Sequence, residues 1–533
     1  MSDFDQFSLS YDSTGYFSKI VSDYLSGADT LRPFYQHLPT VDGIKDAIAA
    51  RKQFATPRTL LVEQLQEQYR GLELSAKTQK NIAALLAENT FTITTAHQPN
   101  IFTGPLYFIY KILHTVKLAE YLSAEMPENN FVPVYYMGSE DADLDEIGSL
   151  NVGGAALKWN TKQTGAVGRM KVDKPFLQLI HAIEGQIGVL EHGIELIALF
   201  KQCYQEGRQI QMATLDLVNQ LFADFGVVVL IPDNPHLKSA YQSVIEKELL
   251  EGFSQQSVAL TTKALEEHYK VQAGGRDINL FYLIDDKRER IELLGDVYEV
   301  KALGLQFTQA EILSELKDHP ERFSANVILR GGFQETVLPN IAFIGGGGEL
   351  AYWLELKSVF EKVGIPYPVL ILRNSFLQIS GTQFQQMKRL DISVEALFQN
   401  GFNLLNLHVK KLTQHQLEIG AEMESISLVY EQLKTVVAKV DTTLVAHVAA
   451  LQTKSAKRLK ELEKKILRAE RLQHETAARQ ITGLKTALFP GNSLQERVLN
   501  MATFYGTFGK SWMQMMYQAS PALSMNFTVI VKD

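Results

Sequence analysis

The chain has 533 residues, of which 46% are apolar and 21% charged, and 52 basic against 60 acidic residues give a net charge of −8. This composition is that of a soluble globular protein, and the length allows several domains or one large domain with insertions. The negative charge argues against nucleic acid as the main partner, and no apolar run is long enough to span a bilayer. The one cysteine, Cys203, excludes an internal disulfide and favours a cytoplasmic location; its helical surroundings predict a packing role.

Residues 1–90 are predicted to be mostly helical. Within them, residues 76–89 place apolar side chains at helical spacing. Ser75 precedes this segment and is the expected N-cap, because its hydroxyl can accept from a free backbone N–H of the first turn.

A strand, a polar turn and a helix come next. Residues 91–95 are apolar and β-branched, and residues 105–122 have an amphipathic pattern that predicts a helix capped by Thr103 or Gly104. The N-terminus of such a helix presents unpaired N–H groups to the turn, which favours an anion. Lys111 lies on this helix near its start. An ordinary strand–turn–helix unit with a surface lysine would show the same pattern.

A second buried strand is predicted at residues 131–137, and it ends in an acidic loop that contains Glu140, Asp141 and Asp143. Strand, helix and strand in this order predict a right-handed βαβ unit and a parallel sheet. Ligands of such sheets lie beyond the carboxyl ends of the strands, where both polar segments fall. The alternative for the acidic loop is a hydrated helix entry, because acidic residues are favoured at a first helical turn.

Three further strands are predicted, at residues 225–233, 323–330 and 367–375. The first is continuously apolar, as a parallel strand covered on both faces should be. The second reaches Arg330 at its end, and the third reaches Arg373. Both arginines are therefore expected beside the acidic loop.

Four consecutive glycines at residues 345–348 open another predicted helix. Glycine lets the backbone approach a ligand closely and leaves its N–H groups available. Glu349, Tyr352 and Trp353 follow at helical spacing and could face the same cleft. A flexible turn before a buried helix, with the aromatic residues in the core, is the alternative.

Residues 381–488 differ in composition from the rest, because glycine and proline nearly vanish and apolar residues recur every three or four positions. This coiled-coil patterning predicts a long antiparallel hairpin or a dimer seam. The basic run at residues 454–471 is expected to be a solvated face. Residues 489–533 are predicted to return to the core as a helix and a terminal strand at residues 525–531.

The predicted cleft combines cations and helix N-termini with an acidic loop. Cations and N–H groups suit a phosphate or a carboxylate, and the acidic loop suits an ammonium group or Mg²⁺. A site with both fits ATP-driven amide formation, in which a carboxylate is activated before an amine attacks it. Asp143 or His97 could accept the proton of that amine.

Taken together, these motifs resemble the bacillithiol biosynthesis cysteine-adding enzyme family, the cysteine ligases. The segments that carry the resemblance are residues 97–100, 103–107, 111, 132–136, 140–146, 225–233, 279–282, 323–330, 345–353, 373–375, 488–491 and 494–497. The chain departs from the family pattern at Ala96-His97-Gln98, where Gly-Gln-Gln is common, and at Ala142, where histidine is frequent.

The resemblance implies an α/β fold with a Rossmann-like, nucleotidyltransferase-related parallel-sheet core over residues 1–380. A connecting region would be inserted at about 151–320, and the coiled-coil arm would form a homodimer. The implied reaction joins L-cysteine to the amine of glucosaminyl-malate, with ATP and Mg²⁺ inferred from the reaction type.

The expected site residues divide into two groups. His97, Lys111 and Asp143 are the expected catalytic residues. The expected substrate- or nucleotide-binding residues are Gln98, Asn100, Gly104, Tyr107, Glu140, Asp141, Arg330, Gly347, Gly348, Glu349, Tyr352, Trp353, Arg373, Asn374 and Ser375. No dedicated metal site is predicted. The competing hypotheses are a related nucleotide-dependent ligase or nucleotidyltransferase with another acceptor, and a non-catalytic coiled-coil scaffold.

Overall fold

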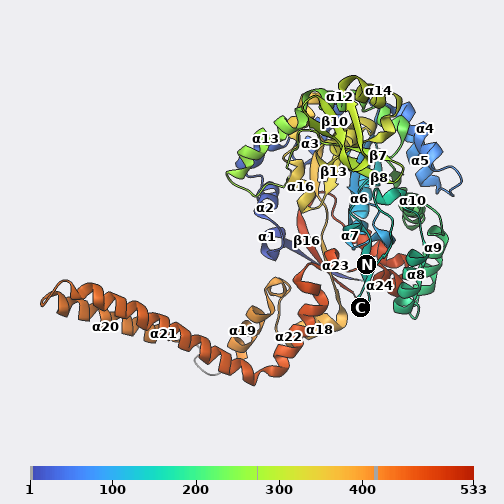
Figure 1. Cartoon of the computed structure of the whole chain (residues 1–533). Helices are drawn as coiled ribbons and strands as arrows, with labels where there is room; N and C mark the ends of the chain where they lie inside the picture. Colours follow the sequence, from blue (N-terminus) through green and yellow to red (C-terminus); the bar gives the residue numbers. More distant parts are fainter. Residues whose placement is uncertain (1–3, 273, 413–417, 533) are drawn as a thin grey trace.

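A five-stranded parallel sheet forms the centre of the protein in the computed structural model, which describes residues 4–272, 274–412 and 418–532 (Figure 1). Its order is β14-β13-β2-β3-β6. The strands are β2 (Thr90–His97), β3 (Asn130–Met137), β6 (Val228–Leu230), β13 (Asn340–Gly345) and β14 (Val369–Leu372). The chain runs from β2 outward to β3 and β6, then returns to β13 on the other side of β2. This reversal confirms the predicted parallel sheet and marks the edge where a ligand is expected.

Two helices, α3 (Val41–Arg51) and α6 (Tyr107–Glu125), cover one face of the sheet. They share a continuous apolar cluster with the strands, which includes Ile44 and Ile48 of α3, Leu118 and Leu122 of α6, and Phe91, Ile93, Ile341 and Ile371 of the sheet. Burial of these side chains on both partners stabilises the layer that carries the carboxyl ends of the strands.

The start of α6 differs from the prediction. The helix is capped by the backbone of Leu106, and Pro105 lies before it in an isolated β-bridge with Asn500. Because the N-cap is Leu106, the prediction that Thr103 or Gly104 caps this helix is wrong. Thr103 and Gly104 instead form a turn with φ angles of 70° and 59°. A turn with positive φ angles therefore precedes the helix, in place of the simple N-cap that the sequence predicted.

The N-terminal region is mostly helical, as predicted, and contains α1 (Tyr11–Thr14), α2 (Lys19–Ser26), α3, α4 (Arg58–Gln68) and α5 (Ala76–Ala84). The Ser75 hydroxyl accepts from the N–H of Thr78, which confirms the N-cap of α5. Strand β1 (Asp5–Ser10) was not predicted, and it pairs with the C-terminal strand β16 (Asn526–Lys532).

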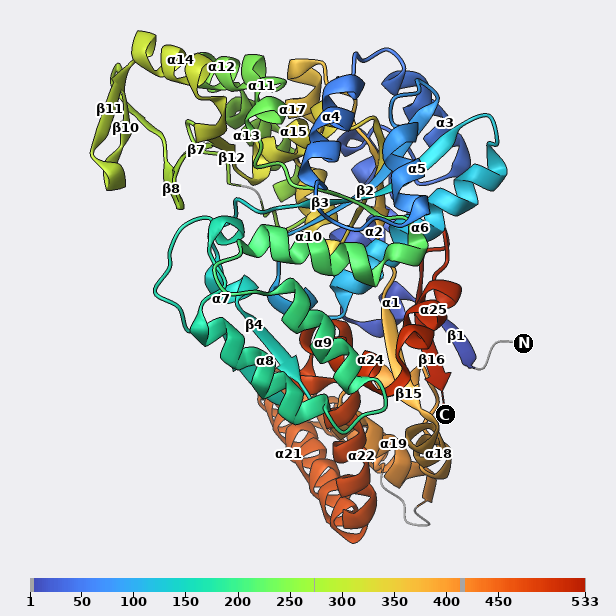
Figure 2. The same ribbon diagram turned by 90° about the vertical axis from the view of Figure 1, so that its right-hand side faces the viewer.

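The segment between β3 and β13 holds a helical layer and a β-rich lobe (Figure 2). The helical layer contains α7 (Leu144–Ile147), β4 (Ser149–Val152), β5 (Ala155–Lys158), α8 (Lys174–Ile187), α9 (Gly193–Cys203) and α10 (Ile210–Leu221). After β6 come α11 (Pro235–Ser239), α12 (Gln242–Glu251), α13 (Phe253–Glu266), β7 (Leu280–Ile284), β8 (Lys287–Arg290), β9 (Glu292–Leu294), β10 (Val297–Val300), β11 (Leu305–Thr308), α14 (Gln309–Asp318) and β12 (Phe323–Ala325). We call the part from β7 to β12 the lobe.

The strand expected at residues 323–330 is wrong beyond its first three residues. β12 stops at Ala325, and the Asn326 side chain accepts from the N–H groups of Ile328 and Leu329 to start α15 (Val327–Val337). Arg330 therefore lies on a helix. The apolar run concealed this boundary because a short buried helix and a buried strand have similar composition.

The part of the chain after β14 contains the predicted arm. After β14 come β15 (Phe376–Ser380), α18 (Gly381–Arg389), α19 (Gly401–Leu412), α20 (Gly420–Ala438), α21 (Leu444–Gln473) and α22 (Glu475–Leu488). Helices α20 and α21 lie side by side as a hairpin that projects far from the body (Figure 1). α23 (Gln495–Val498), α24 (Ala502–Phe508) and α25 (Lys510–Ala519) then return the chain to β16, which pairs with β15 and confirms the predicted terminal strand. Within the described ranges, no helix combines the length and apolarity that a membrane crossing requires.

Candidate active site

A cavity of about 1020 Å³ opens at the carboxyl edge of the parallel sheet. The segments after β2, β3 and β13 and the helices α6, α15 and α16 (Gly347–Trp353) form its core side, and the lobe forms the opposite side. The predicted site residues that line it are His97, Gln98, Tyr107, Lys111, Glu140, Asp141, Arg330, Gly347, Gly348, Glu349, Tyr352 and Arg373. The fold thus brings together segments that are more than two hundred residues apart in the sequence.

Lys111 is a buried residue of the cavity rather than a surface lysine. Its side chain is only 3% exposed, its ammonium donates to the carbonyl of Ala96 at 3.1 Å, and it forms an ion pair with Glu349. Burial lowers the pKa of Lys111, and the carboxylate of Glu349 opposes that shift. This pair joins the end of β2 to the glycine-rich turn across the sheet.

The glycine turn is held in shape by Glu349. Its carboxylate also accepts from the N–H of Gly346 at 2.8 Å, at the start of α16. A Cβ on Gly347 would lie 3.3 Å from Val21, and one on Gly345 would lie 2.9 Å from the ring of Phe343. Close packing therefore disfavours a side chain at Gly345 and leaves little room for one at Gly347.

Arg373 lies between the cavity and a buried carboxylate. Its side chain is 4% exposed and donates to Glu496 at 2.7 Å, and Glu496 itself is fully buried. The guanidinium also lies 5.4 Å from the ring centre of Tyr107, an arrangement that favours a cation–π contact. Much of the charge of Arg373 is therefore already compensated by the protein.

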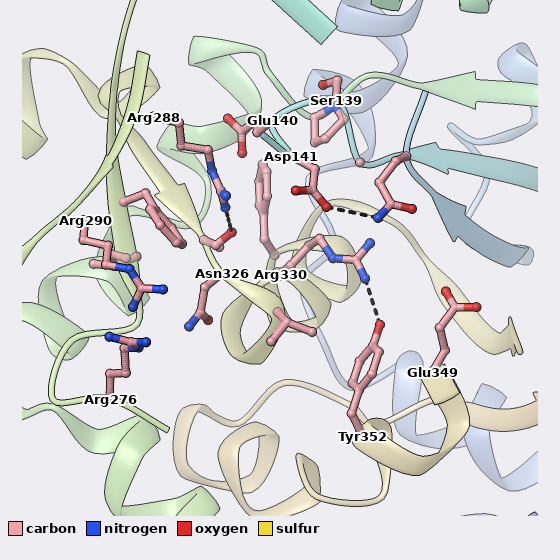
Figure 3. Close-up of a pocket in the computed structure, with 18 of the residues that line it drawn as sticks. Ser139, Glu140, Asp141, Arg276, Arg288, Arg290, Asn326, Arg330, Glu349 and Tyr352 are labelled. Carbon is pink, nitrogen blue, oxygen red and sulfur yellow. Dashed lines mark hydrogen bonds between the residues drawn. The ribbon is translucent and has the colours of Figure 1, made fainter. Parts of the chain in front are cut away.

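Arg330 and Tyr352 meet at the centre of the cavity (Figure 3). The guanidinium of Arg330 donates to the Tyr352 hydroxyl at 2.8 Å, a neutral acceptor that leaves the cationic charge available. We call the set Lys111, Arg330, Glu349 and Arg373 the core wall of the cavity.

His97 lies at the end of β2 with its Nε2 atom buried and, among the described residues, without a hydrogen-bond partner. Burial lowers the pKa of His97 well below the usual histidine value, and Lys111, Arg330 and Arg373 add to that shift. Its ring packs edge-on against Tyr107, with 5.2 Å between ring centres. The imidazole is therefore neutral and has a nitrogen free to exchange a proton or a hydrogen bond with a ligand.

The acidic loop after β3 contributes Glu140 and Asp141 to the cavity. Asp141 accepts from the side-chain amide of Gln98 at 3.1 Å. Glu140 accepts from the Ser324 hydroxyl at 3.0 Å and pairs with Lys238, which is 2% exposed. Side chains of other elements thus hold both carboxylates in place, and the negative charge of the cavity has a defined position.

Six of the expected residues do not line the cavity. Asp143 is exposed, and its carboxylate accepts from the N–H of Glu146 to cap α7, which is the helix-entry role. Asn100 and Gly104 shape the turn after β2, where a Cβ on Gly104 would lie 2.7 Å from the Asn100 side chain. Trp353 stacks on Phe343 in the core, and Asn374 and Ser375 bond to neighbouring buried groups.

The lobe and the segment just before it supply a group of site residues that the sequence prediction missed. Arg276, Arg288 and Arg290 line the cavity opposite Arg330, and we call them the lobe wall (Figure 3). The signal was the alternation in Lys287-Arg-Glu-Arg290, which places Arg288 and Arg290 on the same face of a strand. Only the fold shows that this face turns toward the sheet.

The cavity holds carboxylates, the side chains that bind a hard metal ion, in the part of the chain that the structure describes. No group of three or more histidine, cysteine, aspartate or glutamate side chains lies together there in a form that could hold an ion. Glu140 and Asp141 nevertheless fit the way proteins hold Mg²⁺ beside phosphates, with one or two carboxylates.

The fold and the cavity define a Rossmann-like α/β protein with a mixed-charge small-molecule site and a coiled-coil arm. Two family models cover almost the whole chain: "Bacillithiol biosynthesis BshC, N-terminal Rossmann-like domain" matches residues 4–374, and "Bacillithiol biosynthesis BshC, C-terminal coiled-coil domain" matches residues 376–531. The chain belongs to the bacillithiol biosynthesis BshC family, which confirms the resemblance drawn from its motifs.

Curated relatives are similar in sequence to this chain over nearly their full lengths. A protein of Flavobacterium johnsoniae is 39% identical over 98% of this chain and 99% of its own. Proteins of Christiangramia forsetii and Flavobacterium psychrophilum are 37% and 36% identical, each over 98% of both chains. All three carry the description "Putative cysteine ligase BshC".

Proposed function

We propose that this protein is an ATP-dependent ligase that joins the carboxylate of L-cysteine to the amine of glucosaminyl-malate, the last step of bacillithiol biosynthesis. The observation that carries the proposal is the cavity, which places cationic and acidic side chains around one space in a chain of this family. Such a space suits a reaction among a carboxylate, a phosphate and an amine, where positioning and fixed charges lower the barrier.

The chain's own residues have separate parts in this proposal. ATP would supply the group that activates the cysteine carboxylate. Arg330 would stabilise negative charge on that carboxylate, and Asp141 and Glu140 would hold the amine substrate and the Mg²⁺ that accompanies ATP. His97, neutral and with Nε2 buried at the cavity, would accept the proton of the attacking amine. Asp143 has no part in this scheme, because its carboxylate caps α7.

The direct test is product formation. Purified protein with L-cysteine, glucosaminyl-malate, ATP and Mg²⁺ should form the thiol-bearing amide, detected by mass spectrometry. Arg330→Gln should reduce kcat/KM by about a hundredfold or more, as loss of a charge-stabilising donor does in other enzymes. Arg458→Gln, at an exposed position on α21, is the matched control and should leave kcat/KM unchanged.

The same assay separates the competing functions. Amide formation with amino sugars that lack malate, at the same rate, would favour a ligase with another acceptor. An inactive wild-type protein with intact substrates would contradict the proposal, and an unchanged rate in Arg330→Gln would contradict the placement of the reaction in this cavity.

We also propose that the arm pairs with a second copy of the chain. Helix α20 carries exposed apolar side chains along its length, Leu428, Val429, Leu433 and Val436, and Val440 beyond its end is 81% exposed. Apolar rows of this kind on a coiled-coil domain support oligomerisation, because water contact with them is unfavourable. Sedimentation should give a dimer that Leu433→Glu and Val436→Glu together dissociate. A monomeric wild-type protein would contradict this assignment.

A further inference from the structure

The lobe wall is assembled by a β-hairpin and the segment that precedes it. Arg288 and Arg290 project from the same face of β8, and Arg290 pairs in register with Phe281 of β7. The guanidinium carbon atoms of Arg288 and Arg290 lie 3.9 Å and 5.4 Å from the ring centre of Phe281. Arg276 faces them from the segment before β7, so that three guanidinium groups surround one side of the cavity (Figure 3).

These arginines differ from most other cations of the cavity in forming no ion pair among the described residues. Glu140 and Asp141 act on Arg288, and Glu292 on Arg276 and Arg290, only from a distance. Lys111 pairs with Glu349, Arg373 with Glu496 and Lys301 with Glu292. Within residues 4–272, 274–412 and 418–532, none of the three lobe-wall side chains forms an ion pair, and Arg288 donates only to the Ser324 hydroxyl and the carbonyl of Ala325. Like charges that face one another in a partly desolvated cavity repel, so an anion bound between them would be stabilised.

Apolar surface continues directly from the lobe wall. Leu293 and Leu294 of β9 also line the cavity and are 38% and 49% exposed. Exposed neighbouring leucines at a cavity mouth are suited to a flat apolar group of a ligand. A sugar linked to malate is polar throughout and would gain little from them.

We propose that the lobe wall is the nucleotide subsite, where Arg276, Arg288 and Arg290 bind the polyphosphate of a nucleoside triphosphate and Leu293 and Leu294 pack against its base. Guanidinium groups bind phosphate oxygens in pairs, and three of them match the several charges of a triphosphate better than the two carboxylates of malate. The inference rests on the proposed function for the identity of ATP. It leaves the core wall for the cysteine carboxylate and the amine.

Binding measurements on the full chain test this subsite without requiring catalysis. Titration calorimetry with inorganic tripolyphosphate, ATP and malate should be run on wild type and on Arg276→Gln/Arg290→Gln, which changes two exposed side chains. We expect tripolyphosphate and ATP to bind the double variant at least about tenfold more weakly, with malate unaffected. Arg458→Gln/Arg479→Gln removes two exposed arginines of the arm and is the charge-matched control.

A second variant tests the apolar part. Leu293→Ser/Leu294→Ser should weaken ATP severalfold while tripolyphosphate binds as before, because only ATP carries a base. Equal ATP affinity of wild type and the arginine variant would overturn the proposal, and so would a loss confined to malate. If wild type binds ATP through this wall yet forms no amide from cysteine, the proposed function fails and the nucleotide subsite stands.

Discussion

The two walls of the cavity carry the same kind of side chain for different purposes. On the core wall, Arg373 is 4% exposed and is held by the buried carboxylate of Glu496. On the lobe wall, Arg276 and Arg290 are exposed, and neither has an ion-pair partner among the described residues. The charge of Arg373 is therefore part of the fold, whereas the charge of Arg276 and Arg290 is available to a ligand. The difference predicts which substitutions change stability and which change binding.

The largest effect on stability is expected at Glu496. Glu496→Ala leaves Arg373 buried without its carboxylate and also removes the acceptor of the Ser375 hydroxyl. Breaking such a buried pair should lower the free energy of unfolding by about 3–5 kcal/mol. Denaturant unfolding followed by circular dichroism measures this loss.

Glu461→Ala, on the exposed arm pair with Arg458, is the control and should change the unfolding free energy by less than about 1 kcal/mol. Equal small losses in both variants would mean that the core wall is not the rigid part of the cavity.

An effect of intermediate size on stability, dependent on pH, is expected from His114. Its ring bonds to the backbone of Asn374, next to Arg373 of the core wall. Its Nδ1 accepts from the N–H of Asn374 at 3.2 Å, and the other ring nitrogen lies 2.9 Å from the carbonyl of Ala522. These contacts require the neutral ring with its proton on Nε2. Burial lowers the pKa of His114 to about 4.

Because the unfolded chain takes up a proton near pH 6.5 and the folded chain does not, stability is lost as the pH falls from about 6.5 to about 4. The expected loss is on the order of 3 kcal/mol, measured as the unfolding midpoint against pH. His114→Gln should flatten the profile across that window. A profile equally steep in the variant would assign the pH effect to other groups.

The smallest effect on stability is expected on the lobe wall. Arg276→Gln/Arg290→Gln should change the unfolding free energy by no more than about 0.5 kcal/mol per site, because exposed side chains outside any ion pair of the described residues contribute little to the fold. Denaturant unfolding of the same two proteins used for calorimetry measures this difference in unfolding free energy. A loss of several kcal/mol would make the lobe wall a structural element and remove the contrast with the core wall.

Local patterns in the sequence predicted the centre of the fold well. Strands β2 and β3, the helix between them and the hairpin of the arm follow from runs of apolar residues whose period is long and regular. The predicted strand at residues 323–330 missed the helix start at Asn326, because one capping residue is a weak signal within an apolar run. The predicted helix cap at Thr103 or Gly104 was wrong because the turn there, with its positive φ angles, is held by residues far along the chain. One of these is Asn500, whose side-chain amide donates to the carbonyl of Phe102.

The sequence predicted the site residues that lie at the ends of parallel strands. It missed those whose position depends on how a distant segment folds back onto the sheet. His97 ends β2, and Glu140 and Arg373 follow β3 and β14, so the rule that ligands lie beyond the carboxyl ends of parallel strands predicted that they would come together. Lys111 was expected near the anion, but its burial against Glu349 needs the contact between α6 and the glycine turn. The lobe wall comes from an insertion whose orientation no local pattern encodes.

The most direct test of this account is a crystal structure of the protein with glucosaminyl-malate and a non-hydrolysable ATP analogue. The phosphates are expected to lie against Arg276, Arg288 and Arg290, with the amine of the sugar on the core side near His97 and Asp141. A nucleotide bound outside the cavity, or phosphates on the core wall with malate on the three arginines, would contradict it.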